Sequence, residues 1–201
     1  MKKTFILGFL WASLLSTSAP AVSAPDHFSF SFHTTQGEMR FDCPQGWAPL
    51  GEQRLYELIT TGFFTEVAFF RVIEGFVAQF GISGDPVTSA KWKNANLADD
   101  PVVDSNVAGT LTYADAGPGT RTTQLFINLV DNVRLDALGF SPVCQMANAD
   151  GLGVAKKLYS AYGEGPPSGT GPDQDLITSQ GNAYLQANFS KLDYIQSADL
   201  D

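Results

Sequence analysis

Residues 69–81 read Phe-Phe-Arg-Val-Ile-Glu-Gly-Phe-Val-Ala-Gln-Phe-Gly and form the most informative stretch of the chain. Arg71 is its single cation, and its neighbours are almost all apolar or aromatic. A guanidinium group among such side chains is costly to desolvate unless it has partners. Phe76 and Val77 are placed to build a pocket wall, and Gln79 adds a second polar group. The stretch therefore predicts a functional arginine; the alternative is that Arg71 reaches water from an edge strand.

A second segment favours the functional interpretation. Residues 109–127 read Gly-Thr-Leu-Thr-Tyr-Ala-Asp-Ala-Gly-Pro-Gly-Thr-Arg-Thr-Thr-Gln-Leu-Phe-Ile. The first stretch resembles the "FHRxIxGFxxQGG" block of the cyclophilin-type peptidyl-prolyl cis-trans isomerases, and the second resembles their "GxLSMANAGPxTNGSQFFI" block. A stretch similar to their "WLDGxHVVFG" follows at residues 134–137. The resemblance covers roughly residues 28–163, and its blocks stand in the family's order.

The resemblance implies a mostly β fold, namely a closed eight-stranded antiparallel β-barrel capped by two α-helices. Alternating apolar and polar residues predict a hairpin of strands at 28–32 and 39–43. Further strands are expected within 69–80 and at 109–113, 124–129, 143–146 and 192–197. Helices are expected at 51–61, 151–162 and 182–188. Residues 81–101 and 163–175 are expected to be irregular.

Residues 164–190 are longer than the usual connection before the last strand of the family. We interpret them as an insertion whose aromatic side chains, Tyr184 and Phe189, pack back onto the barrel. The alternative is a mobile surface loop. The predicted domain therefore runs over residues 26–201 and includes this insertion.

The implied activity is acceleration of X-Pro bond rotation in unfolded or flexible polypeptides. Rotation about this bond has a barrier of about 18–20 kcal/mol and requires no cofactor or metal, only an apolar slot for the proline ring and a donor that stabilises the twisted amide. By motif position, Arg71 is the catalytic arginine. The residues expected to bind substrate are Phe76, Val77, Gln79, Ala114, Asp115, Ala116, Gln124, Phe126 and Leu135.

Five positions depart from the family pattern. Phe70 replaces a histidine, Val77 a methionine and Asp115 an asparagine, whose added carboxylate could compete for Arg71. Arg134 replaces a tryptophan that contacts cyclosporin in better-known members, so we expect weak cyclosporin binding. The groove histidine is also missing, with Gly139 or Phe140 in its place.

Two other functions stay open, the first of them because of these departures. One is a low-activity module that binds proline-containing peptides, or acts like a chaperone, through the same groove. The other is an interaction domain that holds a partner through residues 164–190. Nothing in the sequence requires more than a monomer.

Composition limits the remaining function classes. The 201 residues suit one core, and a net charge of −9 provides no basic stripe for a nucleic-acid partner. Lys2 and Lys3 before an apolar run at 5–15 resemble a secretory signal peptide over residues 1–23. Because that run is shorter than the roughly 20 residues that span a bilayer, we expect a secreted, periplasmic or ER-lumenal protein without a permanent membrane anchor.

The remaining reactive residues are few. Cys43 and Cys144 are the only cysteines, and they form either one disulfide or two buried free thiols. The only histidines, His27 and His33, make no plausible zinc site with them. Asn188 begins an Asn-Phe-Ser sequon, which is meaningful only in a eukaryotic secretory pathway.

Overall fold

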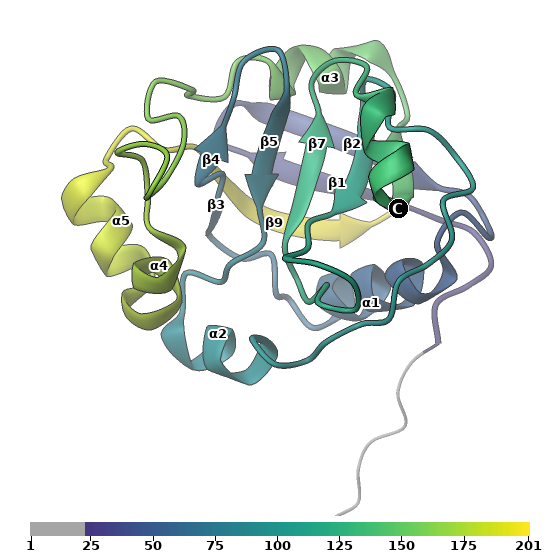
Figure 1. Ribbon diagram of the computed structural model, residues 1–201, viewed down its shortest axis with the longest axis horizontal. Helices are drawn as coiled ribbons and strands as arrows, with labels where there is room; N and C mark the ends of the chain where they lie inside the picture. The colour runs from purple at the N-terminus through teal and green to yellow at the C-terminus, as the bar shows by residue number, and fades with distance from the viewer. Residues whose placement is uncertain (1–22) are drawn as a thin grey trace, which may run out of the picture.

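The computed structural model describes residues 23–201, so residues 1–22 of the predicted signal peptide lie outside the described residues. Nine strands form one curled antiparallel sheet in the order β3-β9-β1-β2-β8-β6-β7-β5-β4 (Figure 1). The strands are β1 Phe28–Thr34, β2 Gly37–Cys43, β3 Val67–Ala68, β4 Arg71–Val72, β5 Val77–Phe80, β6 Thr110–Tyr113, β7 Leu125–Asn128, β8 Pro142–Met146 and β9 Tyr194–Leu200. The helices are α1 Pro49–Thr60, α2 Pro86–Trp92, the 3-10 helix η1 Val133–Leu138, α3 Ala149–Ala155, α4 Gln174–Gln180 and α5 Asn182–Asn188.

The strand count is nine where eight were expected, because one strand is interrupted. β3 pairs with β9 at one end of the sheet order, and β4 pairs with β5 at the other. Only Phe69 and Phe70 separate β3 from β4 along the chain. Residues 67–72 therefore act as one broken strand that joins both ends of the sheet. The cyclophilin-like barrel expected from the sequence is present, with this break as a correction.

The hairpin of β1 and β2 follows directly from its alternating sequence. Facing pairs run from Phe28↔Cys43 to Thr34↔Gly37, and Phe30, Phe32 and Phe41 are fully buried. Their rings pack against one another with centroids 4.9–5.7 Å apart. This aromatic cluster forms the centre of the barrel core, where ring contacts add to the burial of apolar area.

Helix α1 is anchored at its N-terminus by two carboxylates. Asp100 accepts hydrogen bonds from the backbone N–H groups of Leu50 and Gly51 at 3.0 and 2.9 Å, and Glu52 accepts one from Ala48 at 3.1 Å. Such groups satisfy amides that have no partner inside the helix. The helix buries Leu55 and Leu58 against the barrel.

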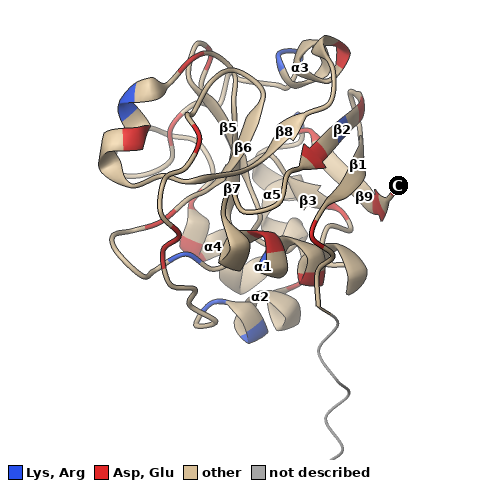
Figure 2. Ribbon diagram, turned by 90° about the vertical axis from the view of Figure 1, so that its right-hand side faces the viewer, with Lys and Arg blue, Asp and Glu red and all other residues tan. Residues whose placement is uncertain are grey.

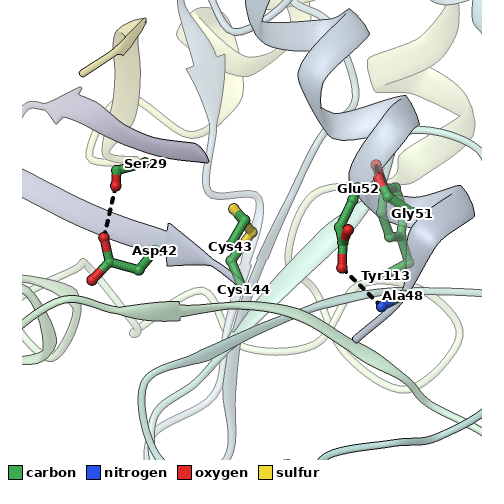
Figure 3. The surroundings of a disulfide bond; sticks show 8 residues. All are labelled: Ser29, Asp42, Cys43, Ala48, Gly51, Glu52, Tyr113 and Cys144. Atoms are coloured by element: carbon green, nitrogen blue, oxygen red, sulfur yellow. Dashed lines mark hydrogen bonds between the residues drawn. A yellow bond between two sulfur atoms is a disulfide. The ribbon is translucent and has the colours of Figure 1, made fainter. Parts of the chain in front are cut away.

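Cys43 and Cys144 form a disulfide, which decides between the two alternatives left open by the sequence. β2 and β8 pair through Phe41↔Met146 and Asp42↔Gln145, and the cysteines are the next facing pair. Figure 3 shows the bridge between the hairpin, where Ser29 donates to Asp42, and the start of α1. The bridge thus continues a ladder of only two residue pairs.

Three helix predictions need correction. α2 lies within residues 81–101, which were expected to be irregular; Asp85 caps it by accepting hydrogen bonds from the N–H groups of Val87 and Thr88, and Pro86 opens it. α4 begins inside the expected irregular segment, where Asp173 provides the same kind of cap. α3 ends at Ala155, well before the expected residue 162. Short side-chain caps were the signals that the apolar periodicity missed.

The segment at residues 164–190 packs onto the outside of the barrel instead of hanging free. Phe70, Ile177 and Leu185 lie together in a second apolar cluster, which also contains Ala68, Ile82 and Leu192. Tyr184 and Phe189 pack against this cluster. In Figure 1, α4 and α5 lie side by side next to β3 and β4. The segment therefore reaches the strand that carries Arg71.

Among the described residues, no helix has the length and apolar character needed to cross a membrane.

Candidate active site

Arg71 and Gln79 are brought together by strand pairing. They face each other across the β4–β5 ladder, so their side chains share one side of the sheet. Arg71 Nη1 donates a hydrogen bond to Gln79 Oε1 at 3.1 Å. The Arg71 side chain is 21% exposed, which places the guanidinium at the edge of the barrel, not in its core. Arg71 thus stands on the last strand of the sheet order, as the edge-strand alternative expects, but its guanidinium is hydrogen-bonded to protein side chains.

The polar row continues from Gln79 across the groove. Gln79 Nε2 donates to Gln124 Oε1 at 2.9 Å, and Gln124 Nε2 donates to Gln174 Oε1 at 3.1 Å. Gln79 and Gln124 each accept on the oxygen and donate through the nitrogen, so the row keeps one direction from Arg71 to the Gln174 oxygen. Gln174 belongs to α4, so the row ends in the segment at residues 164–190.

Glu164 holds the other side of the guanidinium. Its two carboxylate oxygens accept hydrogen bonds from Arg71 Nε at 2.6 Å and from Arg71 Nη2 at 2.7 Å. These hydrogen bonds, opposed by partial burial, lower the pKa of Glu164 below its ordinary value. Paired contacts of this kind are stronger and more directional than a single ion pair. Sequence reasoning missed Glu164, because 93 residues separate it from Arg71.

An apolar cluster lies next to this polar row. Val77, Phe126 and Leu135 form its buried part, and Phe76, Ala114 and Phe140 pack against it. Five of the residues expected to bind substrate are therefore together, namely Phe76, Val77, Ala114, Phe126 and Leu135. Phe140 joins them through a ring contact with Phe126, with centroids 5.8 Å apart. Of the two residues considered at the missing histidine, Phe140 is the one that reaches the cluster.

Buried amides hold the walls of this cluster in place. Asn132 Nδ2 donates to the carbonyl oxygen of Phe76 at 3.0 Å, and Asn106 Nδ2 donates to that of Phe140 at 2.8 Å. Asp136 in η1 accepts hydrogen bonds from the backbone and side chain of Asn106 at 2.9 and 2.8 Å. A satisfied buried network of this kind rigidifies the residues that it joins.

The Phe76 ring contacts two arginines. The guanidinium carbon of Arg71 is 5.7 Å from the ring centroid, and that of Arg134 is 4.7 Å away. Both distances suit a cation–π contact. Arg134 is thus stacked on the edge of the apolar cluster, at the position where the family pattern has tryptophan.

Ala114, Asp115 and Ala116 border a groove of about 230 Å³, together with Gln79, Gln124 and Gln174. Asp115 does not bind Arg71: its carboxylate accepts a hydrogen bond from the N–H of Gly117 at 3.0 Å, and the competing carboxylate at Arg71 is Glu164. A second cavity of about 380 Å³ lies over Arg71 and Gln79, and its other lining residues all come from the segment 164–175.

The arrangement offers a fixed cationic donor, a row of amides and an adjoining apolar surface. Within residues 23–201 there is no group of three or more His, Cys, Asp or Glu side chains arranged to hold a metal ion. The donor and the apolar surface together suit a polypeptide segment with one apolar ring and nearby carbonyl groups.

Comparison with known proteins identifies similar sequences and folds. The family model described as cyclophilin type peptidyl-prolyl cis-trans isomerase/CLD matches residues 29–157. Peptidyl-prolyl cis-trans isomerase B of Escherichia coli is 31% identical over 156 residues, which cover 73% of this chain and 94% of that protein. Peptidyl-prolyl cis-trans isomerase-like 1 of Rhizopus delemar is 30% identical over 133 residues, covering 62% of this chain and 76% of that protein.

Solved structures of cyclophilins have a fold similar to that of this chain. A Cryptosporidium parvum cyclophilin type peptidyl-prolyl cis-trans isomerase has a TM-score of 0.62 and 17% identity, covering 87% of this chain and 98% of that one. Its structure in the presence of the dipeptide Ala-Pro has a TM-score of 0.61 and 17% identity, covering 86% and 98%. At this identity the likeness concerns the fold alone.

Proposed function

The chain belongs to the cyclophilin-type peptidyl-prolyl cis-trans isomerases, and we propose that Arg71 is the group through which it accelerates X-Pro rotation. One observation carries this assignment. The guanidinium is held by Gln79 and Glu164 at hydrogen-bond distance and lies beside the apolar cluster of Val77, Phe126 and Leu135. The donor and the surface for a proline ring are thus adjacent.

The chemistry requires little more than this geometry. As an X-Pro amide twists, resonance is lost and the proline nitrogen gains a lone pair that accepts a hydrogen bond. A donor that is already oriented stabilises the twisted amide more than the planar one, which lowers the barrier of about 18–20 kcal/mol. An arginine suits the role because it stays charged and its donors are fixed in a plane.

The proposed substrates are proline-containing segments of unfolded or flexible polypeptides. The proline ring would lie against Phe76, Phe126 and Leu135, and the preceding residues would lie along the groove at residues 114–116. Gln124 would line the polar side of this groove. The Cryptosporidium parvum neighbour studied in the presence of Ala-Pro supports this substrate class.

A peptide relaxation assay tests the assignment. We expect the wild-type protein to accelerate cis-to-trans relaxation of an X-Pro peptide and Arg71→Ala to lose about 10²-fold or more of that rate, the size of effect seen when one preorganised donor is removed. Arg40→Ala is the matched control, because Arg40 pairs with Asp201 on another part of the sheet. Equal rates for wild type and Arg71→Ala would refute the catalytic role.

A second candidate is a module that binds proline-containing peptides with little turnover. The observation in its favour is that a carboxylate already occupies two donors of Arg71. Titration calorimetry with the same peptide separates the candidates. Binding without acceleration would favour the module, whereas acceleration that depends on Arg71 would exclude it.

We also propose that the protein is exported. Two observations support this: the basic and then apolar N-terminal residues, and the Cys43–Cys144 disulfide, which suits an oxidising compartment. Mass spectrometry of the protein from its native source would test it. Loss of the first 21 to 23 residues is expected, and a retained N-terminus would contradict export by this signal.

We further propose that cyclosporin binds weakly, because Arg134 presents a charged group at the rim of the apolar cluster. Calorimetric titration of wild type and Arg134→Trp tests this, and tighter binding to the variant is the expected result.

A further inference from the structure

Glu164 belongs to the inserted segment, yet it makes the closest contacts that Arg71 has. Its carboxylate meets Nε and Nη2 at 2.6 and 2.7 Å, while Gln79 meets Nη1 at 3.1 Å. The two partners thus bind all three nitrogens of the guanidinium group. An arginine side chain otherwise has about 2 kcal/mol of rotamer entropy to lose when it is ordered.

The contact with Glu164 leaves Arg71 with N–H donors for a substrate. A guanidinium group has five N–H donors, one on Nε and two on each terminal nitrogen. Glu164 and Gln79 together accept three of them. One N–H on Nη1 and one on Nη2 therefore remain for a substrate. The carboxylate orients the group without using all of its donors.

The backbone around Glu164 is itself held in place. Its carbonyl oxygen accepts a hydrogen bond from the N–H of Gly171 at 2.8 Å, and the N–H of Gly169 bonds the carbonyl oxygen of Gly165 at 3.0 Å. A Cβ atom on Gly169 would collide with the carbonyl oxygen of Glu164. The turn that presents the carboxylate is thus closed on itself, so Glu164 enters the site from a fixed support.

We propose that Glu164 is a positioning residue for the isomerase reaction: it holds the Arg71 guanidinium in the orientation that serves the twisted amide, so that the inserted segment completes the active site. The proposal rests on the proposed function of Arg71. Residues 164–174 then take part in catalysis through the Glu164 carboxylate. Gln174 belongs to the same segment and ends the amide row that begins at Arg71.

Steady-state kinetics on the full chain test the proposal. We expect Glu164→Ala to lower kcat about tenfold with little change in KM, since misplacing a catalytic group reduces rate more than binding. Glu164→Gln keeps the shape but only one acceptor oxygen, so an intermediate kcat is expected. Asp201→Ala and Asp201→Asn are matched controls, because they remove the Arg40 ion pair far from β4. A kcat that is unchanged or raised in Glu164→Ala would overturn the proposal.

A second measurement does not depend on turnover. The Nε–H signal of Arg71, assigned by its loss in Arg71→Lys, reports the order of the side chain by ¹⁵N relaxation. We expect a rigid signal in the wild type, a mobile one in Glu164→Ala and partial order in Glu164→Gln. An equally rigid signal in Glu164→Ala would overturn positioning even if the enzyme reaction were absent. Failure of the Arg71 assignment would instead appear as equal turnover by wild type and Arg71→Ala.

Discussion

The Phe70 side chain packs against a part of the chain that is distant in sequence. It precedes Arg71, at the position where the family has a histidine, and it is 2% exposed. Its ring lies with Ile177 and Leu185 from the inserted segment. An apolar residue suits this position because the segment at residues 164–190 covers this side of the barrel. Phe70 and that segment are thus parts of one apolar cluster.

Phe70→His is expected to destabilise the protein although it restores the family residue. The imidazole would enter an apolar cluster without a partner, which costs about 1–3 kcal/mol for the polar group alone. The free energy of unfolding measured in urea should fall by that amount or more. Phe70→Leu, the apolar control, also loses packing but buries no polar group, so its loss should be the smaller of the two. Equal losses for the two variants would mean that polarity at this position is irrelevant.

The hydrogen bonds to the Asp136 carboxylate should make the stability of the protein depend on pH. Burial raises the pKa of this carboxyl, but the hydrogen bonds from Ser105 and Asn106 outweigh burial and lower the pKa below its ordinary value of 3.8. Because the folded-state pKa is depressed, the stabilisation is fully present above pH 3.8 and is lost as the pH falls through the lower folded-state value. Unfolding free energies measured between pH 6 and pH 2 should therefore fall most steeply below about pH 4.

Asp136→Asn is the test of this assignment. It should lower stability at neutral pH by about 2 kcal/mol, the size expected for hydrogen bonds to a charged group. Its stability should also fall less steeply on acidification than that of the wild type. If the free energies of unfolding of the two proteins fell in parallel with pH, Asp136 would not be the source of the loss of stability in acid.

At the scale of elements, the helix pair α4 and α5 docks through a glycine junction. Gly181 has a φ of +62° between the two helices, and a Cβ atom there would collide with the carbonyl oxygen of Gly84. The next residue, Asn182, donates its N–H to the same Gly84 oxygen at 2.9 Å and its side-chain amide to the Glu66 oxygen at 2.8 Å. A side chain at residue 181 should therefore loosen the whole insertion.

Gly181→Ala should make the segment between residues 163 and 181 more sensitive to protease than in the wild type. Gly62→Ala is the matched control, because Gly62 also has a positive φ of +70° but open space around its Cβ position. The control should lose only the stability that the strained backbone costs, about 1–2 kcal/mol. Equal cleavage rates in the two variants would show that the Gly84 contact does not hold the insertion.

The disulfide determines the stability of the β2–β8 junction. Replacing both Cys43 and Cys144 by Ala should lower the free energy of unfolding by about 4 kcal/mol, because the bridge closes a loop with a sequence separation of 101. Urea unfolding with and without reductant measures the same quantity in the wild type. A reduced protein as stable as the oxidised one would contradict this expectation.

The sequence predicts the local pairing of strands but not the contacts between distant segments. The alternation in β1 and β2 predicted their pairing, and the matched blocks predicted that Phe76, Val77, Phe126 and Leu135 would meet. The Glu164 contact was out of reach, because no local pattern relates a carboxylate to an arginine 93 residues away. The start of α2 was within reach, since Asp85 followed by Pro86 is a helix-start signal that periodicity alone overlooks.

At the scale of the whole molecule, acidic residues exceed basic ones. The chain has a net charge of −9, and without residues 1–23 ten basic side chains face twenty-one acidic ones. Figure 2 shows Asp and Glu distributed over many elements and few Lys or Arg. Such a field attracts cationic partners and accelerates their association, and salt screens it over about 8 Å at physiological ionic strength.

Substrate charge should therefore influence kcat/KM. At low salt, an X-Pro peptide flanked by lysines should react about tenfold more efficiently than its glutamate counterpart, and the difference should shrink as salt is added. A neutral peptide of the same length is the control and should depend little on salt. Identical efficiencies for the three peptides at low salt would show that the molecular field does not steer substrates.

The position of the disulfide has a mechanical consequence. Arg71, Phe126 and Leu135 all lie between Cys43 and Cys144, whereas Glu164 lies outside them. Tension applied at the two chain ends would pass through the disulfide instead of the segment that it closes. That segment would not extend, which shortens the fully stretched chain by about 340 Å, at about 3.4 Å per residue. Glu164 and Gln174 would then be drawn away, while Arg71 and residues 114–116 would stay within the bridged segment. A pull on the chain would thus act on the arginine's orientation first.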